Sequence, residues 1–72
     1  MSKIIAYRIT TVHVYNRWME HLFDEGTVVE CEMDFGGVFM ARELGTKGEL
    51  LTLPKEKCRE LTNEEKEKHG IK

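Results

Sequence analysis

The sequence contains no run of apolar residues that approaches the ~20 needed for a membrane-spanning helix. Its first residues, Met1-Ser2-Lys3, lead directly into a segment with strand character, so we expect no signal peptide, no membrane association and a cytoplasmic protein. The only two cysteines, Cys31 and Cys58, lack the C-x-x-C spacing. In a reducing compartment such a pair predicts buried thiols rather than a disulfide bond.

Signatures of catalysis and of metal binding are also missing. A structural zinc site usually takes its ligands in close sequence pairs, because one short loop then presents two donors to the ion. No such pair occurs among the potential ligands His13, His21, Cys31, Cys58 and His69. Nothing places a cysteine beside a histidine or supplies an oxyanion hole, and the glycine turn at residues 45–48 does not match a phosphate loop. We therefore expect no metal, no cofactor and no enzymatic activity.

A basic excess, which most nucleic-acid-binding proteins use to neutralise phosphates, is absent as well. The chain has 11 basic and 13 acidic residues, a net charge of -2 and a pI near 5.9. No lysine or arginine lies between Arg17 and Arg42. That interval holds an acidic run of six side chains: Glu20, Asp24, Glu25, Glu30, Glu32 and Asp34.

What the sequence does contain, from Thr27 to Leu61, is a series of short alternating apolar runs separated by glycine turns. This period is typical of strands in a half-buried antiparallel sheet. Turn signals lie at residues 34–37 and 45–48, where glycine supplies positive φ angles. The residues that we expect to form most of the core are Ile5, Tyr7, Ile9, Val29, Cys31, Met33, Met40, Leu51, Leu53 and Leu61.

The first part of the chain predicts a strand over residues 4–9 and, after a bulge or turn near residues 10 and 11, a second extended piece that ends at Tyr15. Residues 16–25 then change period. Trp18 with Leu22, and Met19 with Phe23, have the spacing of one helix face, with Asn16 as N-cap. Two acidic residues at the C-terminal end oppose the helix dipole, so a single turn or a wide loop is an equal alternative.

The last part predicts a strand at residues 49–53, a helical turn at residues 54–57 and a final strand or short helix at residues 58–61. The capping box formed by Thr62 and Glu65 then begins a polar segment in which residues 63–69 include no apolar side chain. The sequence therefore predicts one small, mainly β domain at residues 1–61 and a loose polar C-terminal tail at residues 62–72.

This order of elements resembles the closing half of SH3-like small barrels. The matching features are the Gly-Thr-Val-Val strand, the two glycine turns and the run Leu50-Leu51-Thr52-Leu53-Pro54 followed by one turn and a last strand. The resemblance covers residues 4–61 and concerns pattern only. The acidic-aromatic loop and the Trp-Trp pair of proline-binding SH3 domains are missing, so it implies a small antiparallel barrel or rolled sheet without that kind of peptide binding.

The leading functional hypothesis is a non-enzymatic regulator or inhibitor that binds a partner protein with a basic surface through an acidic face. The predicted contact residues are Glu30, Glu32, Asp34, Phe35, Trp18 and Tyr15. Alternatives are a nucleic-acid-binding barrel that uses the basic, aromatic N-terminal stretch around Lys3, Arg8 and Arg17, and a homo-oligomer that sequesters a small molecule, for instance at a homodimer interface.

Overall fold

The computed structural model describes residues 3–71. Residues 1 and 2 and Lys72 lie outside the described part. The first two belong to the start of the chain, for which the sequence predicted no signal peptide, and Lys72 ends the predicted tail. The described residues form seven strands, one 3-10 helix and one α-helix. In chain order these are β1 (Ala6–Thr10), β2 (Val14–Tyr15), β3 (His21–Phe23), β4 (Val28–Asp34), β5 (Val38–Glu43), β6 (Leu51–Pro54), η1 (Lys55–Lys57), β7 (Cys58–Glu60) and α1 (Asn63–Lys68).

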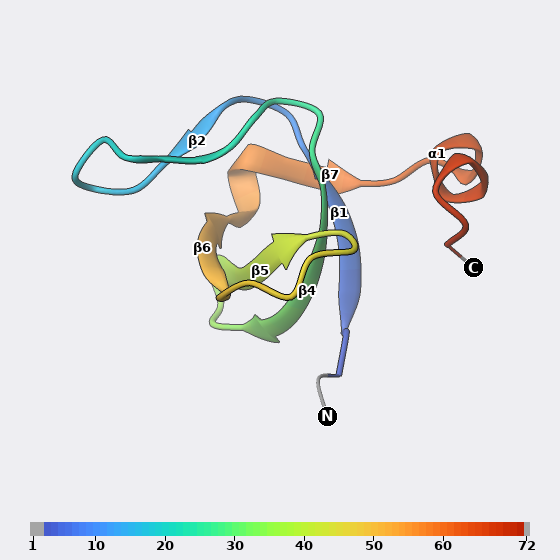
Figure 1. Ribbon diagram of the computed structural model, residues 1–72, viewed down its shortest axis with the longest axis horizontal. Helices are drawn as coiled ribbons and strands as arrows, with labels where there is room; N and C mark the ends of the chain where they lie inside the picture. The colour runs from blue at the N-terminus through green and yellow to red at the C-terminus, as the bar shows by residue number, and fades with distance from the viewer. Residues whose placement is uncertain (1–2, 72) are drawn as a thin grey trace.

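Five strands form one antiparallel sheet in the order β6-β5-β4-β1-β7, and the sheet curls into a half-barrel (Figure 1). The curl has a simple cause. The edge strands β6 and β7 are joined only by the three residues of η1, which span about 6 Å. The two edges must therefore lie close together, which confirms the mainly β class and the small barrel or rolled sheet predicted from the sequence.

The inner face of β1 is the opposite of the predicted one. The cross-strand row Ala6, Cys31, Ala41 and Leu51 faces the interior, so Tyr7 and its neighbours at odd positions face outward. Small side chains fit this row because the tight curl leaves little room between opposite strands. The predicted core residues Tyr7 and Ile9 are consequently only half-buried, and Ile5 is exposed.

A β-bulge in β4 explains the second difference from the predicted core. Cys31 pairs with Ala41 but Met33 pairs with Met40, so Glu32 is an extra residue in β4. Such an extra residue changes which face the following side chains occupy. Met33 is therefore 47% exposed. On β5, which alternates regularly, Phe39 and Ala41 point into the core and the predicted core residue Met40 is only half-buried.

The core lies on the concave face of the half-barrel. Of the predicted core residues, Val29, Cys31, Leu53 and Leu61 are buried as expected, and Leu51 is half-buried against them. The other members of the main buried cluster are Val14, Phe23, Phe39, Ala41 and Cys58. None of them was in the predicted core set, although the thiol of Cys58 was expected to be buried. Val14 and Phe23 belong to the second, two-stranded sheet, which thereby covers the open side of the core.

Residues 14–23 form a hairpin of β2 and β3 and contain no helix. Of the two predicted alternatives for this segment, the turn is therefore correct and the helix is wrong. Phe23 is buried while Met19 is exposed, which contradicts the common helix face proposed for them. Other local predictions hold. Gly36 and Gly45 adopt positive φ angles in the two turns, and the helical turn after β6 is present, with Pro54 one position before it as the extended N-cap.

The C-terminal segment begins with the predicted capping box, in which Thr62 and Glu65 satisfy one another's backbone N–H groups. The segment was expected to be loose because it lacks apolar side chains, and the structure adds a polar contact that the sequence did not suggest. Arg59 of β7 donates two hydrogen bonds to the Glu65 carboxylate, at 2.8 and 2.9 Å, and so holds α1 beside the end of the sheet. The helix itself buries no residue.

Candidate functional site

The β2–β3 hairpin projects from the half-barrel (Figure 1) and ends in a turn of residues 16–20, which we call the hairpin tip. Asn16 organises it. Its side-chain Oδ1 accepts hydrogen bonds from the backbone N–H groups of Trp18 and Glu20, both at 2.9 Å, and its backbone N–H donates to the Glu20 carbonyl at 2.9 Å. Asparagine favours such local bonds, and here they replace the helix N-cap expected from the sequence.

The hairpin tip presents large apolar side chains to solvent. Trp18 is 69% and Met19 is 78% exposed, and Tyr15 lies exposed at the start of the turn. The Arg17 guanidinium stacks over the Trp18 ring at 4.9 Å from its centroid. Met19 also has a φ of 65°, a conformation that costs a residue other than glycine about 1 kcal/mol or more. The largest exposed apolar side chains of the hairpin therefore lie together at its tip.

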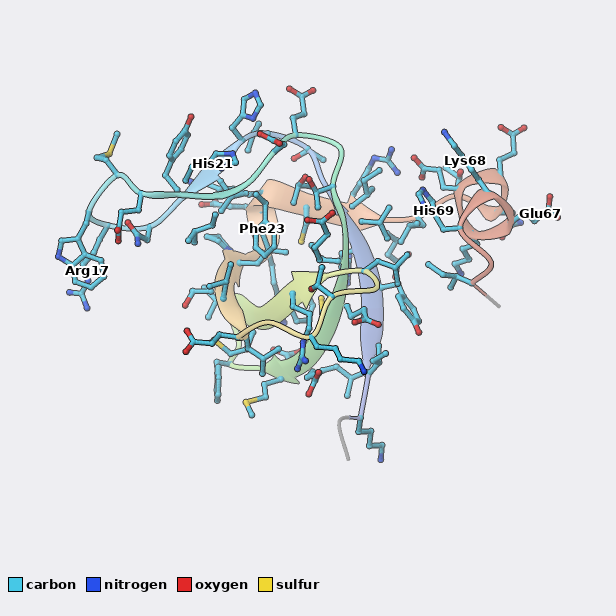
Figure 2. All side chains as sticks on the ribbon, viewed as in Figure 1. Arg17, His21, Phe23, Glu67, Lys68 and His69 are labelled. Atoms are coloured by element: carbon cyan, nitrogen blue, oxygen red, sulfur yellow. The ribbon has the colours of Figure 1, made fainter. Side chains whose placement is uncertain are left out.

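A groove of about 500 Å³ lies between this tip and the end of β6. Its hairpin wall consists of Tyr15 to Trp18 and Leu22, and its sheet wall consists of Thr52 and Pro54. The groove therefore continues the exposed aromatic surface of the tip onto the body of the domain. Figure 2 shows Arg17 at the far end of the hairpin, with Phe23 turned back toward the sheet.

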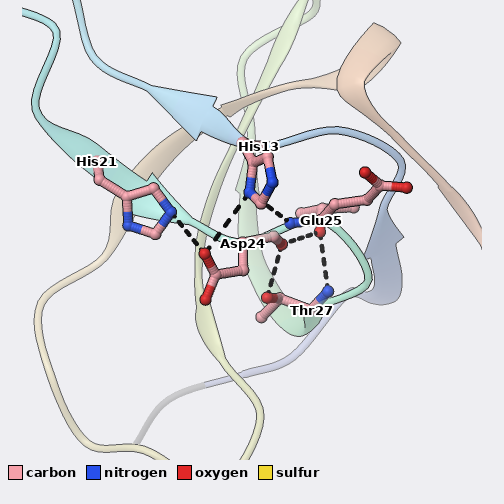
Figure 3. A network of polar contacts seen from close by, with 6 residues as sticks. His13, His21, Asp24, Glu25 and Thr27 are labelled. Carbon is pink, nitrogen blue, oxygen red and sulfur yellow. Dashed lines mark hydrogen bonds and ion pairs between the residues drawn. The ribbon is translucent and has the colours of Figure 1, made fainter.

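Near the base of the hairpin, His13, His21 and Asp24 approach one another (Figure 3). His21 Nε2 lies 2.9 Å and His13 Nδ1 lies 3.6 Å from Asp24 Oδ1. The sequence alone does not reveal this group, because its members lack the close spacing of metal-ligand pairs and meet only through the pairing of two strands. The pairing of β2 with β3 was the signal that could have revealed it.

The acidic run is largely engaged in local contacts. Glu32 forms an ion pair with Arg42, and the two side chains are only 12% and 18% exposed. Glu32 therefore does not point freely into solvent, as a contact residue of an acidic face would, because the bulge directs it toward Arg42. Glu30 is half-buried in the middle of β4. Glu20 accepts a hydrogen bond from the Asn16 side chain, and Asp24, which follows β3, lies 2.9 Å from His21 Nε2 and 3.6 Å from His13 Nδ1.

Asp34 and Phe35 lie at the β4–β5 turn, away from the hairpin tip. Asp34 forms an ion pair with Lys55 at 2.7 Å, and the hydrogen bond from Lys55 lowers the pKa of that carboxyl. Phe35 is exposed at the turn. The six predicted contact residues thus occupy three places: Tyr15 and Trp18 on the hairpin, Asp34 and Phe35 at this turn, and Glu30 and Glu32 on β4.

The basic residues of the N-terminal stretch do not form one face. Arg8 lies on the inner side of the half-barrel, where its guanidinium is 5.2 Å from the centroid of the Phe39 ring. Arg17 is at the hairpin tip and Lys3 precedes β1 at the other end of the first strand. The electrostatic part of the nucleic-acid alternative is weakened by this separation.

Both thiols are free and buried, which confirms that expectation. Burial is the main reason why the pKa of the Cys31 thiol is raised to about 11 and why the pKa of Cys58 is raised as well. A nucleophilic cysteine needs the opposite shift, because the thiolate is the reactive form. Neither thiol therefore has the properties of a catalytic group.

In the described part of the chain, no helix has the length and apolar character that crossing a membrane requires. Comparison of the chain with models of protein families, with curated proteins and with solved structures finds no match.

Proposed function

We propose that this protein is a small, non-enzymatic protein-binding module, a regulator or inhibitor, that contacts its partner mainly through the hairpin tip. The observation that carries the proposal is Trp18, a large ring exposed on a turn whose backbone is fixed by Asn16. Tryptophan is enriched among the residues that dominate binding energy at protein interfaces. A rigid turn also lowers the entropy lost on binding.

The expected partner is a protein with an apolar pocket and a basic rim. Tyr15, Trp18 and Met19 would supply the apolar contact, and the groove beside Pro54 would take up a protruding side chain. Glu20 lies at the hairpin tip and the exposed Glu25 lies two residues after the end of β3, so charge complementarity favours a basic partner surface as the acidic run first indicated. We place Glu30, Glu32 and Asp34 outside the central contact because they are half-buried or engaged in ion pairs.

We also infer an SH3-like arrangement of the half-barrel and a cytoplasmic location. The strand order and the single turn between β6 and β7 support the first. The two free thiols support the second, since reducing compartments preserve them. The fold itself does not select the function.

The experiment begins with capture of partners from cell lysate, with and without nuclease, and then measures the affinity of the purified partner for single variants. Trp18→Ala should weaken binding by at least ~1 to 2 kcal/mol. Phe35→Ala is the matched control, because it removes another exposed ring at a distant turn. If the two variants bind equally well, or if Phe35→Ala has the larger effect, the hairpin tip is not the contact surface.

Met19→Gly provides a second variant that does not damage the fold. Glycine accepts a φ of 65° without strain, so stability should stay within about 1 kcal/mol of the parent while the apolar contact is lost. If the double variant Met19→Gly, Trp18→Ala binds the partner as tightly as the parent does, the proposal is contradicted.

Electrostatic steering is tested with Glu25→Lys, which changes the charge of an exposed side chain. It should reduce mainly the association rate, and higher salt should do the same to the parent because charges are screened beyond ~8 Å at physiological ionic strength. A captured species that disappears with nuclease would instead favour the nucleic-acid alternative, with Arg17 and Trp18 as a stacking platform. A stable homodimer that binds small molecules would favour the sequestering alternative.

A further inference from the structure

Two histidines and one carboxylate converge at the base of the β2–β3 hairpin. His13 directly precedes β2, His21 begins β3 and Asp24 directly follows β3. The pairing of Val14 with Phe23 and of Tyr15 with His21 leaves Leu22 as an extra residue in β3, and this irregularity accompanies the approach of His21 to His13. The two imidazole rings are 6.2 Å apart between centroids.

The backbone around Asp24 is held by the body of the domain. The hydroxyl of Thr10, which is buried, donates a hydrogen bond to the Asp24 carbonyl at 2.6 Å, and the Thr27 hydroxyl donates to the same oxygen at 2.7 Å. The Thr27 N–H in turn donates to the Thr10 hydroxyl at 2.9 Å. The carboxylate therefore extends from a fixed point of the fold, and the two imidazoles meet it from adjoining backbone (Figure 3).

The separations of the donor atoms suit one metal ion. His13, His21 and Asp24 each offer a nitrogen or oxygen atom, and these atoms lie within 4.8 Å of one another. Two ligands that are each about 2.1 Å from a common ion are about 3.0 to 3.4 Å apart in octahedral or tetrahedral geometry. The observed 2.9 and 3.6 Å contacts to Asp24 Oδ1 bracket that distance, and side-chain rotation would bring the two imidazole nitrogens, which lie within 4.8 Å of one another, to a common ion.

The hydrogen bond that His13 accepts is also compatible with an ion. The backbone N–H of Glu25 donates to His13 Nδ1 at 3.2 Å, so this nitrogen presents its lone pair on the side of the cluster. A metal ion would replace that N–H as the partner of the lone pair, and the freed N–H lies at an exposed residue where water can accept its hydrogen bond. The three donors are exposed, so an ion could enter and keep water in its remaining positions.

We propose that His13, His21 and Asp24 form a binding site for one divalent transition-metal ion of the zinc class. The two imidazole nitrogens are borderline donors that prefer such ions to magnesium or calcium, and zinc also accepts the oxygen of a carboxylate as a ligand. The ion would join the residue before β2 to residues at both ends of β3. It would thereby close the base of the hairpin whose tip carries Trp18, and it adjoins the proposed protein contact at Tyr15, whose ring packs edge-on against His21 with 5.5 Å between centroids.

The test is calorimetric titration of the chain, prepared without a histidine tag, with Zn²⁺. Binding of one ion per chain is expected. His13→Ala and His21→Ala should each weaken binding by at least about tenfold, since even residues that only support metal ligands cost that much when removed. Asp24→Asn, which removes the charge and keeps the size, should weaken it as well. His69→Ala is the control, because His69 lies after α1, far from His21 in Figure 2.

Two further readouts separate this site from the thiols and from unfolding. Co²⁺ should produce visible d–d bands without the near-ultraviolet charge-transfer band of a cobalt–thiolate bond, because Cys31 and Cys58 are buried. Zn²⁺ should also raise the melting temperature of the parent but not that of His21→Ala, since a ligand stabilises only the fold that binds it.

The proposal is overturned if the parent shows no saturable Zn²⁺ binding, if the His13 and His21 variants bind as the parent does, or if a thiolate band appears. Circular dichroism of each variant verifies that the sheet persists. None of these measurements involves a partner protein, so the result is independent of the proposed protein-binding function.

Discussion

The ring of Phe39 makes cation–π contacts with Arg8 and Lys55. The contact with Arg8 explains how a charged guanidinium can lie inside the half-barrel. Arg8 lies 5.2 Å and the Lys55 nitrogen 4.8 Å from the ring centroid, and Asp34 pairs with Lys55. Among the described residues, Arg8 Nε is buried without a hydrogen-bond partner. The cation–π contact, worth about 0.5 to 2 kcal/mol, therefore opposes a desolvation cost of about 1 to 3 kcal/mol.

Because these two terms nearly cancel, Arg8→Met should change the free energy of unfolding by no more than about 1 kcal/mol in either direction. Phe39→Ala should instead cost about 3 to 5 kcal/mol, since it empties part of the core. Urea denaturation of both variants measures this difference. A large loss for Arg8→Met would show that the buried charge itself holds the fold.

A second prediction at the residue scale concerns the reactivity of the two thiols. Cys31 and Cys58 should resist iodoacetamide at pH 8 in the folded protein and react readily in denaturant, because burial raises their pKa values and restricts access. Mass spectrometry of the alkylated chain counts the modified residues. Without denaturant, rapid modification of Cys58 would mean that the half-barrel opens near β7, and rapid modification of Cys31 would mean that it opens over the central strand β4.

At the scale of elements, α1 depends on one carboxylate. The hydrogen bonds from Arg59, together with the Thr62 N–H, lower the pKa of Glu65 to about 2. A carboxyl whose pKa is depressed in the folded state stabilises that state above its unfolded pKa, and the contribution disappears as the pH falls through the folded value. The relevant window for Glu65 therefore extends from about pH 4.5 down to about pH 2.

We predict that α1 loses its structure within this acidic window before the central strands do. Amide exchange at residues 63–69 should become fast, while amides of β4 and β5 remain protected. Arg59→Ala should shift the transition to higher pH, because it removes the largest cause of the low pKa. Simultaneous loss of α1 and the sheet would contradict an independent helix.

At the scale of the whole molecule, stability depends on how well the hairpin covers the half-barrel. Val29 and Leu53 are fully buried between the sheet and the pair formed by Val14 and Phe23. A chain of 72 residues typically has only ~3 to 5 kcal/mol of net stability. Each buried side chain therefore represents a large share of the total.

Val29→Ala or Leu53→Ala should cost about 2 to 4 kcal/mol, and Met33→Ala should cost much less because Met33 is about half exposed on the other side of the bulge. Thermal unfolding of the three variants compares them directly. If Met33→Ala proves as damaging as Leu53→Ala, the register after the bulge differs from the one described.

Several features could be predicted from the sequence because they depend on a few neighbouring residues. Gly36 and Gly45 mark turns through their own φ angles, and Thr62 with Glu65 caps a helix through contacts three residues apart. The mainly β class followed from the alternating pattern. In the candidate site, exposure of Tyr15, Trp18 and Phe35 was anticipated from their position near turns, and all three are exposed.

The sequence by itself therefore determined most of the strands of the main sheet, the two glycine turns, the capping box at Thr62 and the buried state of both thiols. Only the tertiary structure decided which side of β1 and β5 faces inward, because both sides carry apolar residues and the choice depends on the strands that pack against them. The bulge at Glu32 and the meeting of His13 with His21 and Asp24 likewise arise from pairing across strands. Distances between strands are set by the folded sheet, and no local pattern encodes them.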